Sequence, residues 1–507
     1  MVSALLAMME ASTAWRWLGG LSALCAALSV GNNVSSSASF FSSEKRGKSA
    51  DGVSSSKRGA SKVGLASLHY EWLALHFVVK LADWLQGTNM YTLYKSYGVD
   101  PGLLFMTGFA TSAAFSTFLG HWVDKYGRKR GCVVYCLLEV VIQVLEHSSD
   151  MRLLLVGRVL GGASTALLFS AFESWLVSAH KQRRLSEESL VRCFSAASTL
   201  NGLSAVLAGL IARVAFMWGG EIAPFQVSLV LTVVALVWIS LRWEENRGEQ
   251  HEQPAEEAGK GGRSPRTRGA KAAAAASAAT GAAGGAAAAA GAPAPSGWQL
   301  VAQPEILACA MVQAVFEGAM YTFVFMWVQT FLTLAPGEQR PPVEVLFSCL
   351  MVALTIGGVI FEHFAESIKE RRPERIGALV FLAAAVSMAA AAFAVHGRGT
   401  GGFVGDQWGL SRVTLIMVAF CLFEVCVGMF DPWMSTMRSL YVPERVMATV
   451  MTLARVPLNL LVGLGVHLTE NYDLQVVFSV CAAMHIVCAS ICSVALRAAK
   501  QRAAKLD

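Results

Sequence analysis

Four acidic residues lie inside long apolar stretches of this 507-residue chain, at Asp83, Glu173, Glu317 and Glu424. A carboxylate within an apolar stretch of membrane length is costly, and it usually faces a water-filled cavity, contacts a substrate or carries protons. Each acid occupies a different apolar segment, namely the first, fourth, seventh or tenth of the core. The four acids therefore predict a polar site. The alternative is structural pairing with Lys80, Arg158, Arg213 or Arg455.

Short repeats link the same segments in the two halves of the chain. Met90-Tyr91-Thr92 recurs as Met320-Tyr321-Thr322, and Phe172-Glu173 recurs as Phe423-Glu424. Transporters built from repeated helical units place their binding site near the midplane, where equivalent helices meet. The repeats favour a cavity position for Tyr91 and Tyr321. Three further aromatic residues could line the cavity or belong to the belt at the membrane surface: Tyr94, Trp175 and Trp327.

Two arginines supply positive charge in the same apolar regions. Arg158 stands early in the fourth segment beside glycines that permit close approach of helices. Arg455 begins the string Arg455-Val-Pro457-Leu-Asn459, in which the proline frees a backbone carbonyl. A guanidinium group near an amide suits a tetrahedral oxyanion, because its planar fork donates two hydrogen bonds. The alternative is a salt bridge from Arg455 to Glu424 or Asp431.

The elements that must position these residues are transmembrane helices. Hydrophobic residues make up 54% of the chain and charged residues 15%, against roughly 25% charged residues in soluble domains. Each crossing needs about 20 apolar residues, and the apolar runs lack the alternation of barrel strands. The sequence predicts an all-α membrane protein with twelve core helices, near 67–95, 100–122, 130–148, 151–179, 190–217, 222–242, 302–331, 344–366, 376–396, 411–436, 444–468 and 473–497.

A linker divides these helices six and six. The predicted regions are an N-terminal apolar helix with a basic, Ser-rich spacer (1–66), a first bundle (67–242), a flexible Ala/Gly-rich linker (243–300), a second bundle (301–498) and a tail (499–507). Lys and Arg gather in alternate connections, which places the linker and the C-terminus in the cytoplasm. An anchor helix explains residues 1–30 better than a signal peptide does, because Glu10 and the lack of an early basic region fit a signal poorly.

Motifs for enzymatic, metal or cofactor chemistry are missing from the sequence. It contains no Walker P-loop, no H-E-x-x-H, no G-x-S-x-G and no Cys/His metal cluster. Most of the eleven cysteines lie inside apolar runs, as small packing residues do. We therefore expect a protein that is not an enzyme and that binds no cofactor or metal.

A glycine-rich basic turn follows the second core helix. It reads Gly120-His-Trp-Val-Asp124-Lys-Tyr-Gly127-Arg128-Lys-Arg-Gly. The glycines allow a tight turn, and Asp124 can pair with a basic partner or accept from a helix N-terminus. This turn resembles the signature loop of the major facilitator superfamily, both in its residues and in its position. The resemblance implies a conformational latch made by Gly120, Asp124, Gly127 and Arg128. The equivalent stretch of the second half, 361–372, keeps the basic residues but lacks the glycines.

Longer strings resemble the molybdate-anion transporter family of that superfamily. They include Asp83-Trp-Leu-Gln86-Gly, the run from Gly157 to Trp175, Phe423-Glu424 with Pro432, and Arg455-Val-Pro-Leu-Asn459. The likeness covers all twelve core segments and the extra N-terminal stretch, but not the Ala/Gly linker. It implies a major-facilitator fold in the plasma membrane and secondary active uptake of molybdate by alternating access.

The residues expected to contact substrate or to couple protons are Asp83, Gln86, Tyr91, Arg158, Glu173, Glu317, Tyr321, Glu424, Arg455 and Asn459. Expected partners are a small oxyanion, protons and the lipid bilayer, and no nucleic acid. Four acids in one cavity would repel a dianion unless several were protonated or paired. Two alternatives therefore stay open: the same fold with another cargo, such as a sugar, an organic cation or a metabolite, or a receptor or scaffold without transport.

Overall fold

The structure, a computed structural model, describes residues 14–26, 56–116, 118–183, 185, 187–246, 303–334, 341–370, 373–396, 412–442 and 444–496. All regular elements in these ranges are helices. The first half contains α2 (Ser56–Ser96), α3 (Pro101–Ser116), α4 (Leu119–Tyr126), α5 (Arg128–Leu145), α6 (Met151–Leu168), α7 (Ala171–Gln182), α8 (Glu187–Gly219) and α9 (Ala223–Arg242). The second half contains α11 (Pro304–Leu334), α12 (Val343–Glu370), α13 (Pro373–Val395), α15 (Arg412–Tyr441), α16 (Glu444–Asn471) and α17 (Leu474–Ile491).

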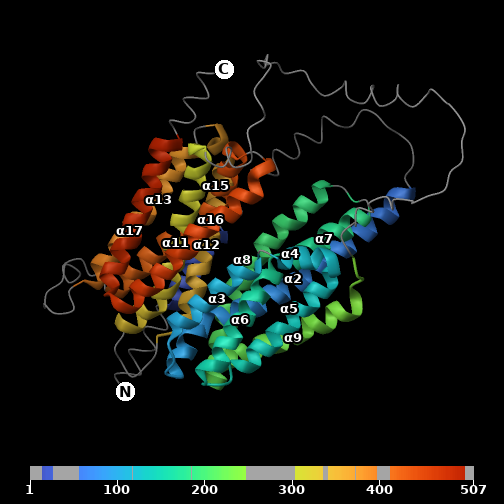
Figure 1. The fold of residues 1–507 in the computed structure, drawn as a ribbon, viewed down its shortest axis with the longest axis horizontal. Coiled ribbons are helices and arrows are strands. Elements are labelled where there is room, and N and C mark those ends of the chain that lie inside the picture. Colours follow the sequence, from blue (N-terminus) through green and yellow to red (C-terminus); the bar gives the residue numbers. More distant parts are fainter. Residues whose placement is uncertain are drawn as a thin grey trace, which may run out of the picture.

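Two groups of helices make up the fold, one blue to green and one yellow to red in Figure 1. Each of the twelve predicted segments overlaps a helix, which confirms the predicted helical membrane architecture. The two ends of the helical bundle are named here for use in the following sections. The end of the bundle that holds Arg242 and Pro304 is called the linker-side end, because the predicted linker joins these residues. The opposite end, with Gly219 and Val343, is called the far end.

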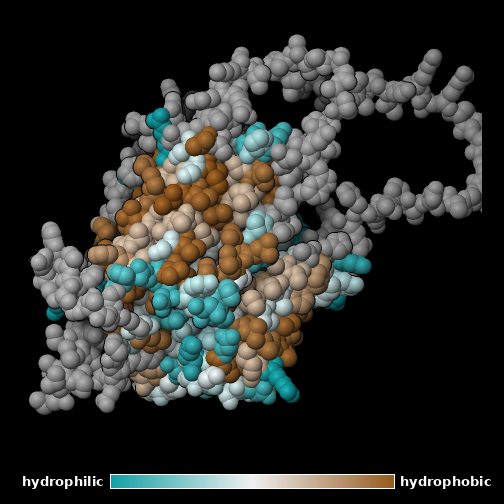
Figure 2. All heavy atoms as spheres, turned by 60° about the vertical axis from the view of Figure 1, so that its left-hand side comes forward, coloured by the Kyte–Doolittle hydropathy of each residue, from teal (hydrophilic) through white to brown (hydrophobic). Residues whose placement is uncertain are grey.

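The outer surface has the character of a lipid-facing one. Within the described residues, seven helical segments are long and apolar enough to cross a membrane. Large apolar side chains are exposed along the outer helices of the second half, and Figure 2 shows hydrophobic residues spread over this face. Examples on α13 are Leu379, Val386 and Phe393. In water such a surface would be unfavourable, whereas helices satisfy their backbone polar groups internally and so tolerate lipid.

Two predicted segments are each split into two helices. The segment predicted at 100–122 is divided between α3 and α4, and that at 151–179 is divided between α6 and α7. Phe169 and Ser170 separate α6 from α7. The Ser170 hydroxyl donates to the Ala166 carbonyl at 2.7 Å, and the Ser174 hydroxyl donates to the Ser170 carbonyl at 2.5 Å. Such bonds compete with the helical ladder and bend helices, which explains why continuous hydrophobicity did not reveal the break.

The N-terminal region contains a helix at 14–26, in agreement with the extra apolar helix predicted there. Ala14 and Leu18 are buried in the core of the second half, and the Ala14 carbonyl accepts from Cys349 Sγ at 3.6 Å. α2 begins at Ser56, so the end of the predicted spacer is helical, since extending a helix costs little once it has formed. The rest of the spacer, the linker beyond 246 and the tail lie outside the described residues.

The two halves meet closely at the far end. α8 contacts α12, and α3 contacts α16. Asn89 of α2 donates to Glu344 Oε1 of α12 at 3.0 Å, and Arg213 of α8 lies 3.6 Å from Glu344 Oε2. The Glu344 side chain is fully buried. Because it joins three helices from both halves, this cluster closes the far end of the space between them.

A substitution at Gly209 tests how closely α8 and α12 pack at the far end. A methyl group there would collide with the Glu344 carbonyl and the Ser348 hydroxyl of the other half, whereas one at Gly463 meets nothing within 4 Å. We expect Gly209→Ala to destabilise the protein by roughly 1–3 kcal/mol, the usual cost of overpacking. Gly463→Ala, in the interior of α16, should keep or raise the melting temperature in detergent, because alanine favours the helix more than glycine does. Equal melting temperatures for the two variants would contradict close contact at the far end.

Candidate functional site

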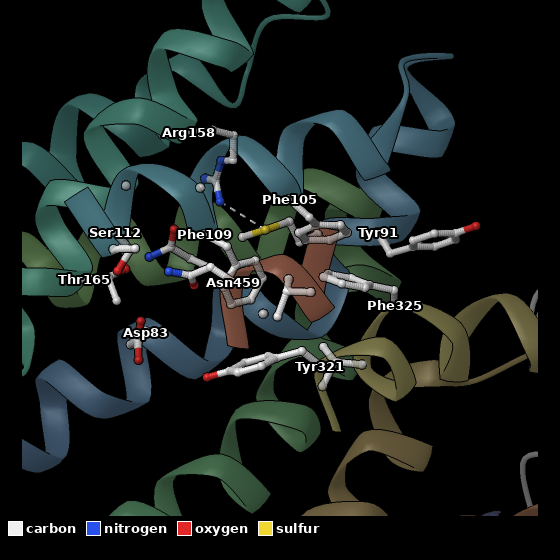
Figure 3. Close-up of a pocket in the computed structure, with 18 of the residues that line it drawn as sticks. Asp83, Tyr91, Phe105, Phe109, Ser112, Arg158, Thr165, Tyr321, Phe325 and Asn459 are labelled. Atoms are coloured by element: carbon white, nitrogen blue, oxygen red, sulfur yellow. Dashed lines mark hydrogen bonds between the residues drawn. The ribbon is translucent and has the colours of Figure 1, made fainter. Parts of the chain in front are cut away.

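A cavity of about 480 Å³ lies between the two halves. α2, α3, α5 and α6 line it from the first half, and α11 and α16 line it from the second. Figure 3 shows Arg158 on one side of this space, Asp83 and Tyr321 on another, and the small polar groups of Ser112, Thr165 and Asn459 nearby. The cavity is therefore large enough for a small solute and carries both charges and neutral hydrogen-bonding groups.

Most of the predicted site residues line this cavity. They are Asp83, Gln86, Tyr91, Arg158, Glu317, Tyr321, Arg455 and Asn459. Two predicted acids do not. Glu173 lines a separate pocket in the first half, and Glu424 is only 6% exposed within the second half. The four acids therefore do not converge on one site as expected, because the break before α7 and the packing of α15 direct Glu173 and Glu424 elsewhere.

Arg158 is held by an acid that the sequence analysis did not single out. Its guanidinium group donates to Glu146 Oε1 at 2.6 Å and lies 3.2 Å from the Met90 sulfur, the contact drawn in Figure 3. Glu146 also accepts from the Tyr94 hydroxyl at 2.8 Å, and its side chain is 1% exposed. Tyr94 is fully buried, so it belongs to this network and not to an aromatic belt. Glu146 escaped notice because it stands at the end of its apolar run.

A second buried acid, Glu139, contributes a carboxylate to the lining of the cavity. It accepts from Gln86 Nε2 at 2.8 Å and from Gln143 Nε2 at 3.4 Å. The Ser164 hydroxyl of α6 also donates to it. These bonds join three helices of the first half and satisfy the carboxylate without a cation. The signal that could have identified Glu139 was the pair of polar residues, Glu139 and Gln143, one helical turn apart in an apolar run.

A chain of hydrogen bonds connects polar side chains of α15 and α11 in the second half. Arg438 donates to Gln313 Oε1 at 3.1 Å, and Gln313 Nε2 donates to Glu317 Oε1 at 3.0 Å. Glu317 in turn lies within electrostatic reach of Arg455, whose side chain is exposed and lines the cavity. In the described part of the chain, no ion pair joins Arg455 to Glu424 or Asp431, the alternative left open from the sequence. Arg455 is thus available to a ligand.

The aromatic residues separate into different environments. Tyr91 lies at the margin of the view in Figure 3, with its hydroxyl directed outward, and Lys95 Nζ is 5.8 Å from its ring centroid. Tyr321 packs edge-on against Phe109 of α3, and Trp327 also lines the cavity. Trp175 stacks on Trp243 at 3.8 Å, outside the cavity. Of the aromatic candidates, Tyr91, Tyr321 and Trp327 therefore border the central space.

The stretch predicted as a glycine-rich turn, 120–131, is mostly helical, since residues 120–126 belong to α4 and residues 128–131 to α5, and only Gly127 separates the two helices. The contacts of Gly120 and of the Asp124 side chain lie outside the described part of the structure. Gly127 has φ +124°, a conformation that favours glycine. A Cβ there would lie 2.5 Å from the Glu245 carboxyl carbon. Glu245 accepts from the backbone N–H groups of Lys129 and Arg130 at 2.9 and 3.1 Å, so it caps the N-terminus of α5.

The pairing of Arg158 with Glu146 predicts a stability effect of its own. Arg158→Met leaves the buried Glu146 without its cation, which costs roughly 3–5 kcal/mol. The double variant Arg158→Met/Glu146→Leu should recover most of this loss, because neither charge is left alone. As a control, Arg242→Met removes an exposed pair with Glu71 and should cost about 1 kcal/mol or less.

Melting temperatures of the purified variants in detergent measure this effect. If Arg158→Met melted at the same temperature as Arg242→Met, the Arg158–Glu146 pair would not be a buried structural contact.

Several curated relatives are similar to this chain over most of its length. A molybdate-anion transporter of Xenopus laevis is 28% identical over 438 residues, which cover 84% of this chain and 85% of the relative. A molybdate-anion transporter of Danio rerio is 28% identical over 391 residues, with 76% and 75% covered.

Solved structures of transporters share the fold. A nucleoside transporter superposes with a TM-score of 0.59 at 10% identity, covering 84% of this chain and 99% of that structure. A peptide transporter with bound alafosfalin gives 0.58 at 16% identity, with 85% and 94% covered. A D-xylose–proton symporter gives 0.58 at 10% identity, with 86% and 98% covered. At these identities the likeness establishes the fold alone.

A family model described as sugar transporters with 12 transmembrane helices matches residues 48–262 and 296–423. The matched ranges cover more than half of the chain, and they include the cavity-lining parts of α2, α3, α5, α6 and α11. With its two six-helix halves and a cavity between them, the chain is an integral, multi-pass membrane protein that belongs to this transporter family of the major facilitator superfamily.

Proposed function

We propose that this protein is a secondary transporter that imports molybdate through the central cavity by alternating access. The observation that carries the proposal is the cavity itself, lined by both halves and containing the exposed guanidinium group of Arg455 beside the amide of Asn459. An arginine and an amide one turn apart can donate several hydrogen bonds to a tetrahedral oxyanion. The named relatives, which are molybdate-anion transporters, support the same substrate class.

The charges of the cavity are compatible with an anion once their partners are considered. Glu146 is paired with Arg158, and Glu139 is hydrogen-bonded by Gln86, Gln143 and Ser164. Glu173 and Glu424 lie elsewhere. Asp83 and Glu317 therefore remain as the acids nearest to a bound anion. We propose that they are protonated when the anion is bound, which would couple its uptake to protons.

Alternating access requires one end of the cavity to close while the other opens. The contacts of Glu344 and Gly209 join the halves at the far end. We propose that the far end faces outside, that the linker and the C-terminus are cytoplasmic, and that the protein resides in the plasma membrane. In this arrangement the structure corresponds to an inward-facing state. Gly120, Asp124, Gly127 and Arg128 would then act as a latch at the cytoplasmic side, close to the cap that Glu245 provides for α5.

Uptake of labelled molybdate into cells that lack their own molybdate importers tests the substrate. We expect saturable uptake that sulfate inhibits. Arg455→Gln should lower uptake roughly tenfold to a hundredfold, because a hydrogen bond to a charged group contributes about 1.5–3 kcal/mol. Arg242→Gln, which alters an exposed arginine outside the cavity, is the matched control. Absence of uptake by well-expressed wild-type protein would rule out molybdate, and cations and sugars would be offered next.

The role of Glu317 predicts a difference in pH dependence between two glutamates. Uptake by wild-type protein should rise when the external pH is lowered, since protons enter with the anion. Glu317→Gln mimics one of the two protonated acids and should weaken the pH dependence, leaving only the part that Asp83 confers. Glu424→Gln, which changes a buried acid outside the cavity, should keep the pH dependence. Uptake rates measured at two external pH values show which glutamate is responsible for the pH dependence. If uptake by Glu424→Gln were independent of pH, the proton-coupling site would lie in the core of the second half instead.

A further inference from the structure

A second pocket of about 240 Å³ lies in the first half, beside the central cavity. α2, α8 and the α6–α7 break line it. The two spaces share one residue, Phe169, which lies in the break and is 69% exposed. The aromatic ring of Phe169 therefore stands between the central cavity and this second pocket.

The second pocket lies closer to the linker-side end than the central cavity does. On α2 it is lined by residues from Trp72 to Lys80, whereas the central cavity begins at Asp83. On α8 it uses residues 194–201, which precede the far-end contacts of Gly209 and Arg213. A solute that moved from the central cavity towards the linker-side end along the first half would therefore pass this pocket.

Lys80 gives the pocket a cation that makes no ion pair among the described residues, although it lies within electrostatic reach of Asp83 on the same helix. Its ammonium group lies 4.6 Å from the centroid of the Phe169 ring. Arg158 and Arg213 pair with Glu146 and Glu344, but in the described ranges no carboxylate lies within ion-pair distance of Lys80. An ammonium group held over an aromatic face keeps its hydrogen-bond donors for a ligand.

Neutral donors stand around this cation. Trp84 Nε1 donates to Asn201 Oδ1 at 3.0 Å, which fixes the amide and leaves its N–H groups for the pocket. Ser198 contributes a hydroxyl group, and His76 Nδ1 is buried without a hydrogen-bond partner in the part of the chain described. Together these groups can surround an oxyanion on several sides. Glu173, the one acid in the lining, disfavours an anion and so keeps its binding weak.

We propose that this pocket is a second oxyanion site, occupied in transit between the central cavity and the linker-side end, with Lys80 as its charged ligand. Weak, successive sites speed movement of an ion, since each binds well enough to be entered and loosely enough to be left. Phe169 separates the two sites. The inference rests on the proposed transport of an oxyanion, and it adds a residue, Lys80, and a location that the central cavity does not include.

A cysteine placed in the pocket tests this site directly. Within the described residues ten of the native cysteines are buried and Cys25 is half-buried, so background labelling is low. Ser198→Cys would be labelled with N-ethylmaleimide. This reagent is uncharged, so a bound anion slows its reaction by blocking access and not by repelling the reagent. At a molybdate concentration ten times its dissociation constant, we expect labelling to slow roughly tenfold, as mass action requires.

Four further variants identify the site that confers protection. Lys80→Met should abolish it and Lys80→Arg should restore it, whereas Lys181→Met, an exposed lysine on α7 outside the pocket, should leave it unchanged. Arg455→Gln, which weakens the central site, should preserve it. Protection that survives Lys80→Met, or that disappears in Arg455→Gln, would overturn the second site.

Molybdate uptake by the Ser198→Cys protein separates this inference from the proposed function. Normal uptake without protection would overturn the second site alone. Absence of uptake in both this variant and the wild type would overturn the proposed function and the second site together.

Discussion

A charge removed from water must be met by an opposite charge or by several hydrogen bonds, and the interior of this protein is organised by that constraint. Arg158 and Glu146 meet it as an ion pair, with Tyr94 as a third member. Glu139 meets it with neutral donors from three helices. Glu344 of the second half meets it with Asn89 and Arg213 of the first half, so the polar requirement of one helix produces the contact that closes the far end.

The same pairing decides which charges remain for function. Arg158 is paired with the buried Glu146, so it holds helices together and its charge is already compensated, although its Nε has no hydrogen-bond partner among the described residues. Arg455 and Lys80 differ from Arg158 in this respect, because each borders an open space without an ion pair among the described residues. The path through the molecule is therefore defined less by the number of charged residues than by which of them have partners.

The sequence was sufficient for the helical architecture and for much of the cavity. Apolar runs of membrane length located each core helix, and the repeats around Tyr91 and Tyr321 identified residues that border the same space. The sequence was insufficient where position depends on backbone geometry. Hydropathy is continuous through Phe169 and Ser170, so nothing showed that α7 starts anew and places Glu173 in a different pocket. Glu146 and Glu344 stand at helix ends, and their burial depends on partners from other segments of the chain.

The helix at 14–26 packs into the core of the second half, although it precedes the whole first half in the chain. During synthesis this segment is made before the first bundle, yet its packing partners in α12, such as Cys349, are made only after that bundle is complete. The chain therefore joins the first bundle to the second twice, once through the segment that precedes α2 and once through the linker that follows α9. If the central linker were cut, the helix at 14–26 would still join the N-terminal fragment to the core of the C-terminal fragment, so the two fragments would stay associated.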